Sequence, residues 1–214
     1  MNLLAIFLTA WVVGFTGAAT PGPISTLVVT ESSRRGFWAG PLLTLGHAVA
    51  ELTLVVGLAL GLRQLLSSAR FALAIALVGG IFLLWMGLST LRDALRRPWD
   101  SGSSAKGQPY AQRWGPAFAG LGASFTNPYW FLWWSTVGAS YVTLSLQHGT
   151  PGLAAFYSGH ILSDLSWNSL LAFLMATGRR WLPGKFMRGF LTIAGLFLIG
   201  LGGYFVALAI QRIR

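Results

Sequence analysis

Apolar residues run in long stretches with at most one charged residue each along this chain, separated by short polar segments. Six stretches exceed the roughly 20 residues that a helix needs to cross a bilayer core about 30 Å thick. They lie at about 3–29, 37–62, 71–91, 116–146, 152–177 and 190–210. This pattern predicts an all-α membrane protein with six transmembrane helices.

Two of the stretches are too long to be straight helices. Counted to their polar ends, residues 3–33 and 115–146 would each form a helix of roughly 45–48 Å. Both contain helix-breaking segments, Thr20-Pro21-Gly22-Pro23 in the first stretch and Thr126-Asn127-Pro128 in the fourth. Proline removes a backbone donor and clashes with the preceding turn, so we expect helices 1 and 4 to be broken at these prolines. An ordinary proline kink is the alternative.

The composition narrows the class of protein. Charged residues make up 9% of the chain and hydrophobic residues 54%, whereas a soluble domain has about 25% charged residues. Too few charges are present to cover a water-soluble surface. The chain has no cysteine, which excludes disulfides and thiolate metal sites.

The net charge of +10 would favour a nucleic-acid partner in a soluble protein, but here the basic residues flank the apolar stretches. Four lie on one side: Arg63, Arg70, Arg212 and Arg214. Eleven lie on the other: Arg34, Arg35, Arg92, Arg96, Arg97, Lys106, Arg113, Arg179, Arg180, Lys185 and Arg188. Cytoplasmic loops carry the excess of Lys and Arg. We therefore expect a multi-pass protein with both termini outside and no nucleic-acid partner.

The polar segment 98–113 is the one linker-like stretch in the sequence. It divides a single transmembrane domain, 1–214, into two halves of three helices each, at 1–97 and 114–214. Because three is an odd number, the second half crosses the membrane in the opposite orientation. The halves are therefore predicted to be inverted repeats, as in many transporters.

A short signature occurs once in the second helix of each half. It is a Gly-His pair with an acid four residues after the histidine, and its two copies are Gly46-His47 with Glu51 and Gly159-His160 with Asp164. The copies are 113 residues apart at every position. A recurrence at matching places supports an internal repeat more strongly than either copy alone.

Both acids fall near the centre of their apolar stretch, about 2 Å from the expected midplane. A charged side chain there costs about 2.5–3.5 kcal/mol, so we expect Glu51 and Asp164 to face a cavity or to be protonated. Each histidine lies on the same helix face as its acid and is expected to tune the acid or relay protons. Asn168 and Trp167 lie near Asp164 and are further candidates for binding substrate. The alternative is a hydrogen-bonded pair that only holds helices together.

No Lys or Arg falls within the core of any predicted helix, so the cavity should prefer cationic, zwitterionic or protonic cargo. The broken helices complement the acids, because the unpaired N–H groups at a helix start attract a carboxylate. The set expected to form the hinges and bind a carboxylate is Thr20, Pro21, Gly22, Pro23, Ser25, Thr26, Asn127 and Pro128. Two acids and two helix starts together fit a zwitterion.

Two Gly-x-x-x-Gly pairs, Gly36 with Gly40 and Gly57 with Gly61, allow helices to approach closely. They favour packing within the chain, and a homodimer face is the alternative. Lipid is an expected partner, since several tryptophans lie near helix ends, where interfacial belts form.

The order of these features resembles the LysE/RhtB family of bacterial amino-acid exporters. The resemblance rests on Gly17-Ala18-Ala19-Thr20-Pro21-Gly22-Pro23, on Arg34-Arg35-Gly36 with Gly40 and Gly46, and on Asn127-Pro128. It implies a six-helix exporter of the inner membrane that moves a small amino acid or related metabolite, driven by proton exchange. It also implies that the chain is not an enzyme and needs no cofactor.

The two His-acid pairs depart from the commoner members of that family, and they leave the cargo open. Imidazole and carboxylate are both acceptable ligands for a divalent transition metal. A metal-cation exporter with His47, Glu51, His160 and Asp164 as ligands is therefore the second interpretation, after amino-acid export.

Overall fold

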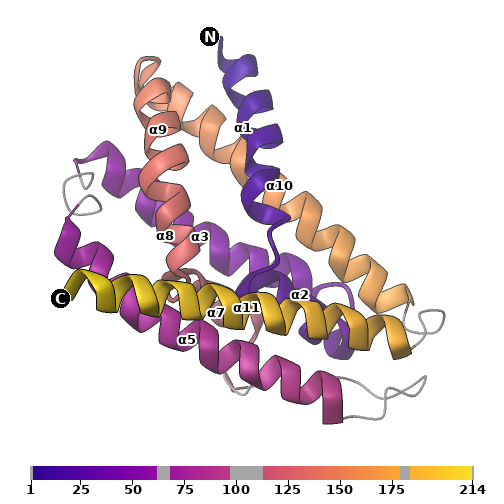
Figure 1. The fold of residues 1–214 in the computed structure, drawn as a ribbon. Helices are drawn as coiled ribbons and strands as arrows, with labels where there is room; N and C mark the ends of the chain where they lie inside the picture. The colour runs from indigo at the N-terminus through magenta and orange to yellow at the C-terminus, as the bar shows by residue number, and fades with distance from the viewer. Residues whose placement is uncertain (1, 62–67, 97–112, 179–183, 214) are drawn as a thin grey trace.

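The computed structural model describes residues 2–61, 68–96, 113–178 and 184–213, and the regular elements in these ranges are all helical. Figure 1 shows their arrangement. The helices are α1 (Leu3–Ala18), α2 (Pro23–Arg35), α3 (Ala39–Ala59), α5 (Ala69–Arg96), α7 (Pro116–Phe125), α8 (Pro128–Trp133), a π-helical turn (Trp134–Gly138), α9 (Ala139–Leu146), α10 (Gly149–Gly178) and α11 (Gly184–Ile213).

The first predicted break is present. Helix α1 ends at Ala18, α2 begins at Pro23, and the two axes are bent by 79°. Pro23 occupies the first position of α2, where a missing N–H costs nothing because that group has no intrahelical acceptor. Gly22 precedes it in an extended conformation and offers no side chain to cap the new helix.

The second break lies at Thr126 and Asn127, between α7 and α8. Here the new helix is capped, because Asn127 Oδ1 accepts a hydrogen bond of 3.1 Å from the backbone N–H of Tyr129. The sequence did not indicate the π-helical turn that follows α8. A side chain at Gly138 would collide with the ring of Trp134, so the glycine allows the indole to fold back over the turn.

Three of the described helices, α3, α5 and α11, are individually long and apolar enough to cross a membrane, and the bent α1–α2 pair makes a fourth candidate. The prediction of six spans is thus matched in part. Helix α10 is long enough, with 30 residues, but His160, Asp164 and Asn168 lower its mean hydropathy. The fourth predicted span, 116–146, is divided among α7, α8, the π-helical turn and α9.

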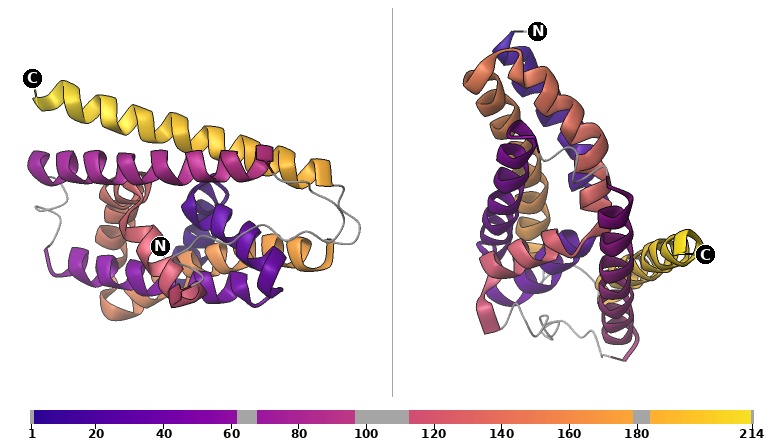
Figure 2. Two further views of the ribbon diagram at one scale, coloured as in Figure 1. Left: turned by 90° about the horizontal axis from the view of Figure 1, so that it is seen from below. Right: turned by 90° about the vertical axis from the view of Figure 1, so that its left-hand side faces the viewer.

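The helices pair across the two halves of the chain: α1 packs against α10, α3 against α7, and α5 against α11. Figure 2 shows α5 and α11 side by side in both views. Glycines permit these contacts. A side chain at Gly46 would collide with the carbonyl of Ala117, and one at Gly159 would collide with the carbonyl of Phe7.

Two apolar clusters enclose the centre of the molecule. One joins α2, α3, α5 and α11 around Leu27, Leu43 and Leu83, and the other surrounds Trp134 and Phe156. The outer faces of α5 and α11 carry exposed apolar side chains, among them Ile81 and Ile193. Outward apolar faces of this kind suit contact with lipid.

Several sequence predictions fall outside the described residues. These are the linker 98–113 apart from Arg113, and the basic residues Arg63, Arg97, Lys106, Arg179, Arg180 and Arg214. Of the glycine pairs, Gly40 packs within the chain, since a side chain there would approach Ala172 Cβ at 2.5 Å. A Cβ added at Gly36 or Gly61 would have no atom within 4 Å, and both residues have positive φ angles. They therefore form turns and not close helix contacts.

Candidate functional site

A cavity of about 60 Å³ brings together both helix breaks and both copies of the His-acid signature. Among the predicted site residues, it is lined by Thr20, Pro21, Gly22, Pro23, Ser25, His47, Glu51, Asn127, His160, Asp164 and Asn168. These residues come from the α1–α2 break, α2, α3, α10 and the α7–α8 break. Glu51 and Asp164, which the sequence leaves 113 residues apart, therefore face one shared space.

Glu51 lies at the centre of a dense hydrogen-bonding network. Its Oε1 atom lies 3.1 Å from His47 Nε2 and 3.2 Å from His160 Nε2. The same oxygen accepts hydrogen bonds of 3.2 Å from the indole N–H groups of Trp130 and Trp134. Four nitrogen atoms from three helical segments thus converge on one carboxylate oxygen, which ties α3 to α10 and to the segment after the second break.

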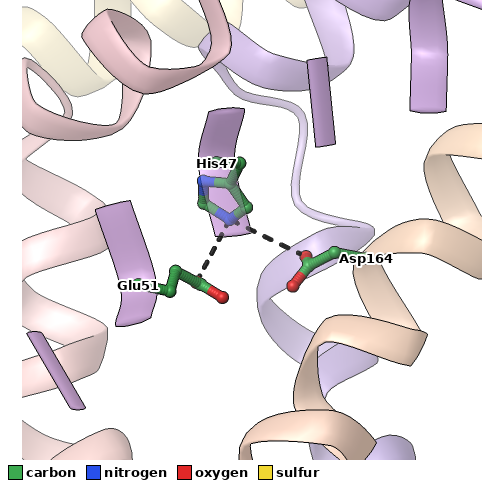
Figure 3. A group of neighbouring side chains, drawn as sticks. All are labelled: His47, Glu51 and Asp164. Carbon is green, nitrogen blue, oxygen red and sulfur yellow. Dashed lines mark ion pairs between the residues drawn. The ribbon is translucent and has the colours of Figure 1, made fainter. Parts of the chain in front are cut away.

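Asp164 is held much more loosely than Glu51. Its carboxylate oxygens lie 3.7 Å from His160 Nε2 and 4.0 Å from His47 Nε2, beyond the range of a normal hydrogen bond. Its Oδ2 atom is buried without a partner. Figure 3 shows His47 between the two acids, with Glu51 on the same helix and Asp164 on α10.

His47 is held at both ring nitrogens. Its Nδ1 atom lies 2.6 Å from Ser124 Oγ, which in turn lies 2.8 Å from the Gly120 carbonyl oxygen. Its Nε2 atom lies 3.1 Å from Glu51 Oε1. The ring therefore links Ser124 of α7 to Glu51 of α3 at the wall of the cavity.

His160 is fixed mainly by aromatic contacts. Its ring stacks on Trp133, with centroids 4.6 Å apart, and on Phe156 at 5.9 Å. Its Nδ1 atom is buried and has no hydrogen-bond partner. That atom faces Gly14 of α1, where an added Cβ would lie 3.0 Å from Nδ1.

Asn168 lies one turn beyond Asp164 on α10. Its Nδ2 group donates to Thr44 Oγ1 at 3.1 Å, and Thr44 in turn donates to the Gly40 carbonyl. With the amide nitrogen at this contact, the amide oxygen, Oδ1, is buried without a partner.

Three predicted site residues lie away from the cavity lining. Thr26 is buried and bonds to the Gly22 carbonyl at 2.9 Å. Pro128 lines a separate apolar cavity of about 160 Å³, together with Phe71 and Phe205. Trp167 packs against the apolar cluster around Leu27.

Sequence reasoning missed several residues of the site. Ser124 and the indoles of Trp130 and Trp134 hold the His-acid network, although their positions carry no motif of their own. The spacing of Trp130 and Trp134, four residues apart directly after the Asn127-Pro128 break, was the available signal, because such residues share a helix face. No Lys or Arg is among the described residues that line the cavity.

The imidazole and carboxylate groups that line this cavity could also bind a metal cation. One nitrogen or oxygen atom from each of His47, Glu51 and Asp164 lies within 4.8 Å of the others. His160 Nε2 lies close to both acids. Imidazole nitrogen and carboxylate oxygen are ordinary ligands for divalent transition metals.

Comparison with known proteins identifies relatives over nearly the full length of the chain. The chain is 28% identical to the "Putative amino acid efflux protein YcgF" of Bacillus subtilis, over 94% of each chain. It is 28% identical to the "Chemotactic transduction protein ChpE" of Pseudomonas aeruginosa, over 94% of this chain and 97% of that one. It is 26% identical to the "Threonine efflux protein" of Escherichia coli K12, over 81% and 84%.

No solved structure matches the chain. Residues 15–208 match the model of a protein family described as LysE type translocator. This match covers both helix breaks and both His-acid signatures, and it leaves out most of α1 and the end of α11. The chain therefore belongs to the LysE type translocator family, and it is a multi-pass membrane transporter rather than an enzyme.

Proposed function

We propose that the protein exports a small zwitterionic amino acid or a related metabolite across the inner membrane in exchange for protons. The observation that carries this proposal is the shared cavity, because it places two acids, two histidines and an uncapped helix start around one space. The efflux activity named for two of its relatives supports the same substrate class.

The carboxylate of the cargo would bind at the start of α2. The first N–H groups of a helix have no intrahelical acceptors, and Gly22 provides no side-chain cap. Pro23 lacks an N–H, so Ile24 and Ser25 are the first residues that can donate, and both line the cavity. The start of α8 is less suitable, because Asn127 already caps Tyr129.

The ammonium group of the cargo would bind on the acidic side of the cavity, where no described Lys or Arg competes. The contact between His47 and Glu51 at the cavity wall supports proton exchange, because imidazole and carboxyl groups can take up and release protons. A cationic group that binds beside them would favour release of a proton. Such competition between cargo and proton is the simplest basis for antiport.

The cavity also sets a requirement for movement. At about 60 Å³ it has room for about four to six water molecules at 10–15 Å³ each. A cargo molecule enters only if the surrounding helices move apart. We infer alternating access by rocking of the two halves, 1–97 and 114–214, around the broken helices.

The cross-pairing of helices supports the inverted-repeat interpretation. Gly46 of α3 contacts Ala117 of α7, and Gly159 of α10 contacts Phe7 of α1 in the same way. Each signature glycine thus packs against the first helix of the other half, as expected for two repeats related by a two-fold axis. Six spans then follow, with α1–α2 and α7–α9 as the broken ones and both termini outside.

The most direct test is thermal stabilisation of the purified protein in detergent, since a bound ligand raises apparent stability by mass action. The panel consists of the twenty common amino acids, Zn²⁺ and Mn²⁺. We expect stabilisation by one or more small amino acids in the wild type and its loss in the Glu51→Gln/Asp164→Asn variant. The Asp164→Asn variant alone serves where the double variant does not fold. No stabilisation by any amino acid would overturn the proposal.

A second candidate is export of a divalent metal cation. It is favoured by the spacing of the ligand atoms, 3.1–4.0 Å between each histidine Nε2 and its acid partners. Atoms that bind Zn²⁺ tetrahedrally at about 2.0–2.2 Å are separated by distances near the lower half of this range. His47 also bonds Ser124 through its other nitrogen, as metal-bound histidines usually do. Stabilisation by Zn²⁺ or Mn²⁺ alone would select this candidate.

A further inference from the structure

The two His-acid pairs have unequal surroundings. Glu51 Oε1 is contacted by two imidazoles and two indole N–H groups, whereas Asp164 Oδ2 has no partner. Both side chains are almost fully buried, with 1% and 4% of their residue surfaces exposed. The difference therefore lies in their hydrogen bonds and not in access to water.

The difference between the pairs follows from different residues at equivalent positions of the two halves. Ser124 lies seven residues after Ala117 on α7, and Gly14 lies seven residues after Phe7 on α1. Given the matching contacts of Ala117 and Phe7, Gly14 is the counterpart of Ser124. His47 has a serine to bond with, while His160 faces a glycine and its Nδ1 atom has no partner.

The indole donors also lack counterparts. Trp130 and Trp134 lie two and six residues after Pro128, and the residues two and six after Pro23 are Ser25 and Val29. If the two halves exchanged conformations during transport, the break before α2 would therefore still offer Asp164 no indole donor. The inequality is chemical, so it persists through a transport cycle.

A second unpartnered acceptor lies next to Asp164. Asn168 is one turn further along α10, is 2% exposed and lines the same cavity. Its Nδ2 group is held by Thr44, which leaves Oδ1 without a partner. Residues four apart on a helix have neighbouring side chains. Two residues that line the cavity on one side of α10 thus each have a buried acceptor oxygen without a hydrogen-bond partner.

We propose that Asp164 Oδ2 and Asn168 Oδ1 form the binding site for the primary ammonium group of the cargo, and that Glu51 is a fixed anion that holds the helices together. This inference rests on the proposed function. An ammonium group has three N–H donors and no acceptor, which is the complement of these two acceptor oxygens. Glu51 keeps one free oxygen, Oε2, but the four nitrogen donors beside it disfavour an approaching cation.

The assignment makes opposite predictions for stability without any ligand. A buried acceptor without a partner is destabilising, so Asp164→Leu, which removes the carboxylate, is expected to raise Tm by about 2–4 °C. Glu51→Leu leaves four donors without their acceptor and is expected to lower Tm by at least as much. A lower Tm for Asp164→Leu than for Glu51→Leu would overturn the division between the two acids.

Recognition of the amine is tested with matched probes. The wild type is assayed for thermal stabilisation by L-threonine and by 3-hydroxybutanoate, which lacks only the amine. If L-threonine does not bind, the amino acid that stabilises the protein most is used instead, together with the same carboxylic acid without its amine. We expect a preference of at least tenfold for the amine in the wild type.

Asn168→Leu and Asp164→Asn are expected to reduce that preference to less than threefold. Asn168→Asp, which has an acceptor oxygen where Asn168→Leu has none, is expected to keep the preference of the wild type. If Asn168 had a purely structural role, Asn168→Leu would instead weaken the binding of both probes equally. If amino acids bind but both variants keep the preference, this inference fails and the proposed function stands. If none of the twenty amino acids binds the wild type, both fail.

Discussion

His160 on α10 places its Nε2 atom 3.2 Å from Oε1 of Glu51 on α3. The two residues belong to different halves of the chain and are 109 positions apart. Aromatic residues border the contact, because His160 stacks on Trp133 and Trp134 donates to the same oxygen. A polar link between the halves thus lies at the wall of the cavity where the cargo is proposed to bind.

This link predicts an energetic coupling between the two residues. In a double-mutant cycle with Glu51→Gln and His160→Gln, the free energies of unfolding should deviate from additivity by about 0.5–3 kcal/mol. Denaturation in detergent measures the four stabilities. The matched control combines Glu51→Gln with Ser158→Ala, an exposed position on α10, and should be additive within about 0.5 kcal/mol. An additive result for the His160 cycle would contradict the contact.

Ser124→Ala is expected to destabilise the protein. The substitution leaves the buried Nδ1 atom of His47 without its hydrogen-bond partner, which costs about 1–3 kcal/mol. The free energy of unfolding in detergent is the measurement, and Ser140→Ala, at an exposed position on α9, is the control. Equal stabilities for the two variants would show that the contact between His47 and Ser124 contributes nothing to stability.

The close approach of α3 and α7 predicts a large effect of a single methyl group. Gly46→Ala would drive Cβ into the Ala117 carbonyl, and overpacking of this kind costs about 1–3 kcal/mol. Gly122→Ala on α7 is the matched control, because nothing lies within 4 Å of its added Cβ. The Tm of Gly122→Ala should equal or exceed that of the wild type, while Gly46→Ala should melt lower.

Asn127→Ala tests the second helix break. It removes the side chain that caps Tyr129, and loss of such a cap costs about 0.5–2 kcal/mol. The backbone N–H of Tyr129, which lines the cavity, would then lack its acceptor. Binding of an anionic probe such as 3-hydroxybutanoate should therefore not weaken. A stability equal to the wild type would mean that the cap contributes nothing to α8.

The sequence was informative where a residue type has a strong local effect. Proline cannot continue a helix, so the breaks at Pro23 and Pro128 could be located to within a few residues. The His-acid signature could be found because it occurs twice at one spacing. Its two copies share a cavity, but this depends on helix packing through Gly46 and Gly159, which periodicity does not reveal.

Other features of the site depend on tertiary contacts alone. Ser124, Trp130 and Trp134 resemble ordinary small or aromatic residues of a membrane helix until folding brings them to His47 and Glu51. Trp167 shows the reverse: its spacing of three residues from Asp164 suggested a contact with substrate, whereas it packs against an apolar cluster. Helical spacing places side chains on a face but does not decide what that face meets.

The central claim is that the shared cavity exchanges an amino acid for protons. The most direct measurement is flux in proteoliposomes, with radiolabelled L-threonine and a pH-sensitive dye followed together under an imposed pH gradient, extended to the other amino acids that stabilise the protein. The account predicts amino-acid flux coupled to proton flux in the opposite direction, and loss of both in Asp164→Asn. Amino-acid flux that neither moves protons nor responds to the pH gradient would contradict it.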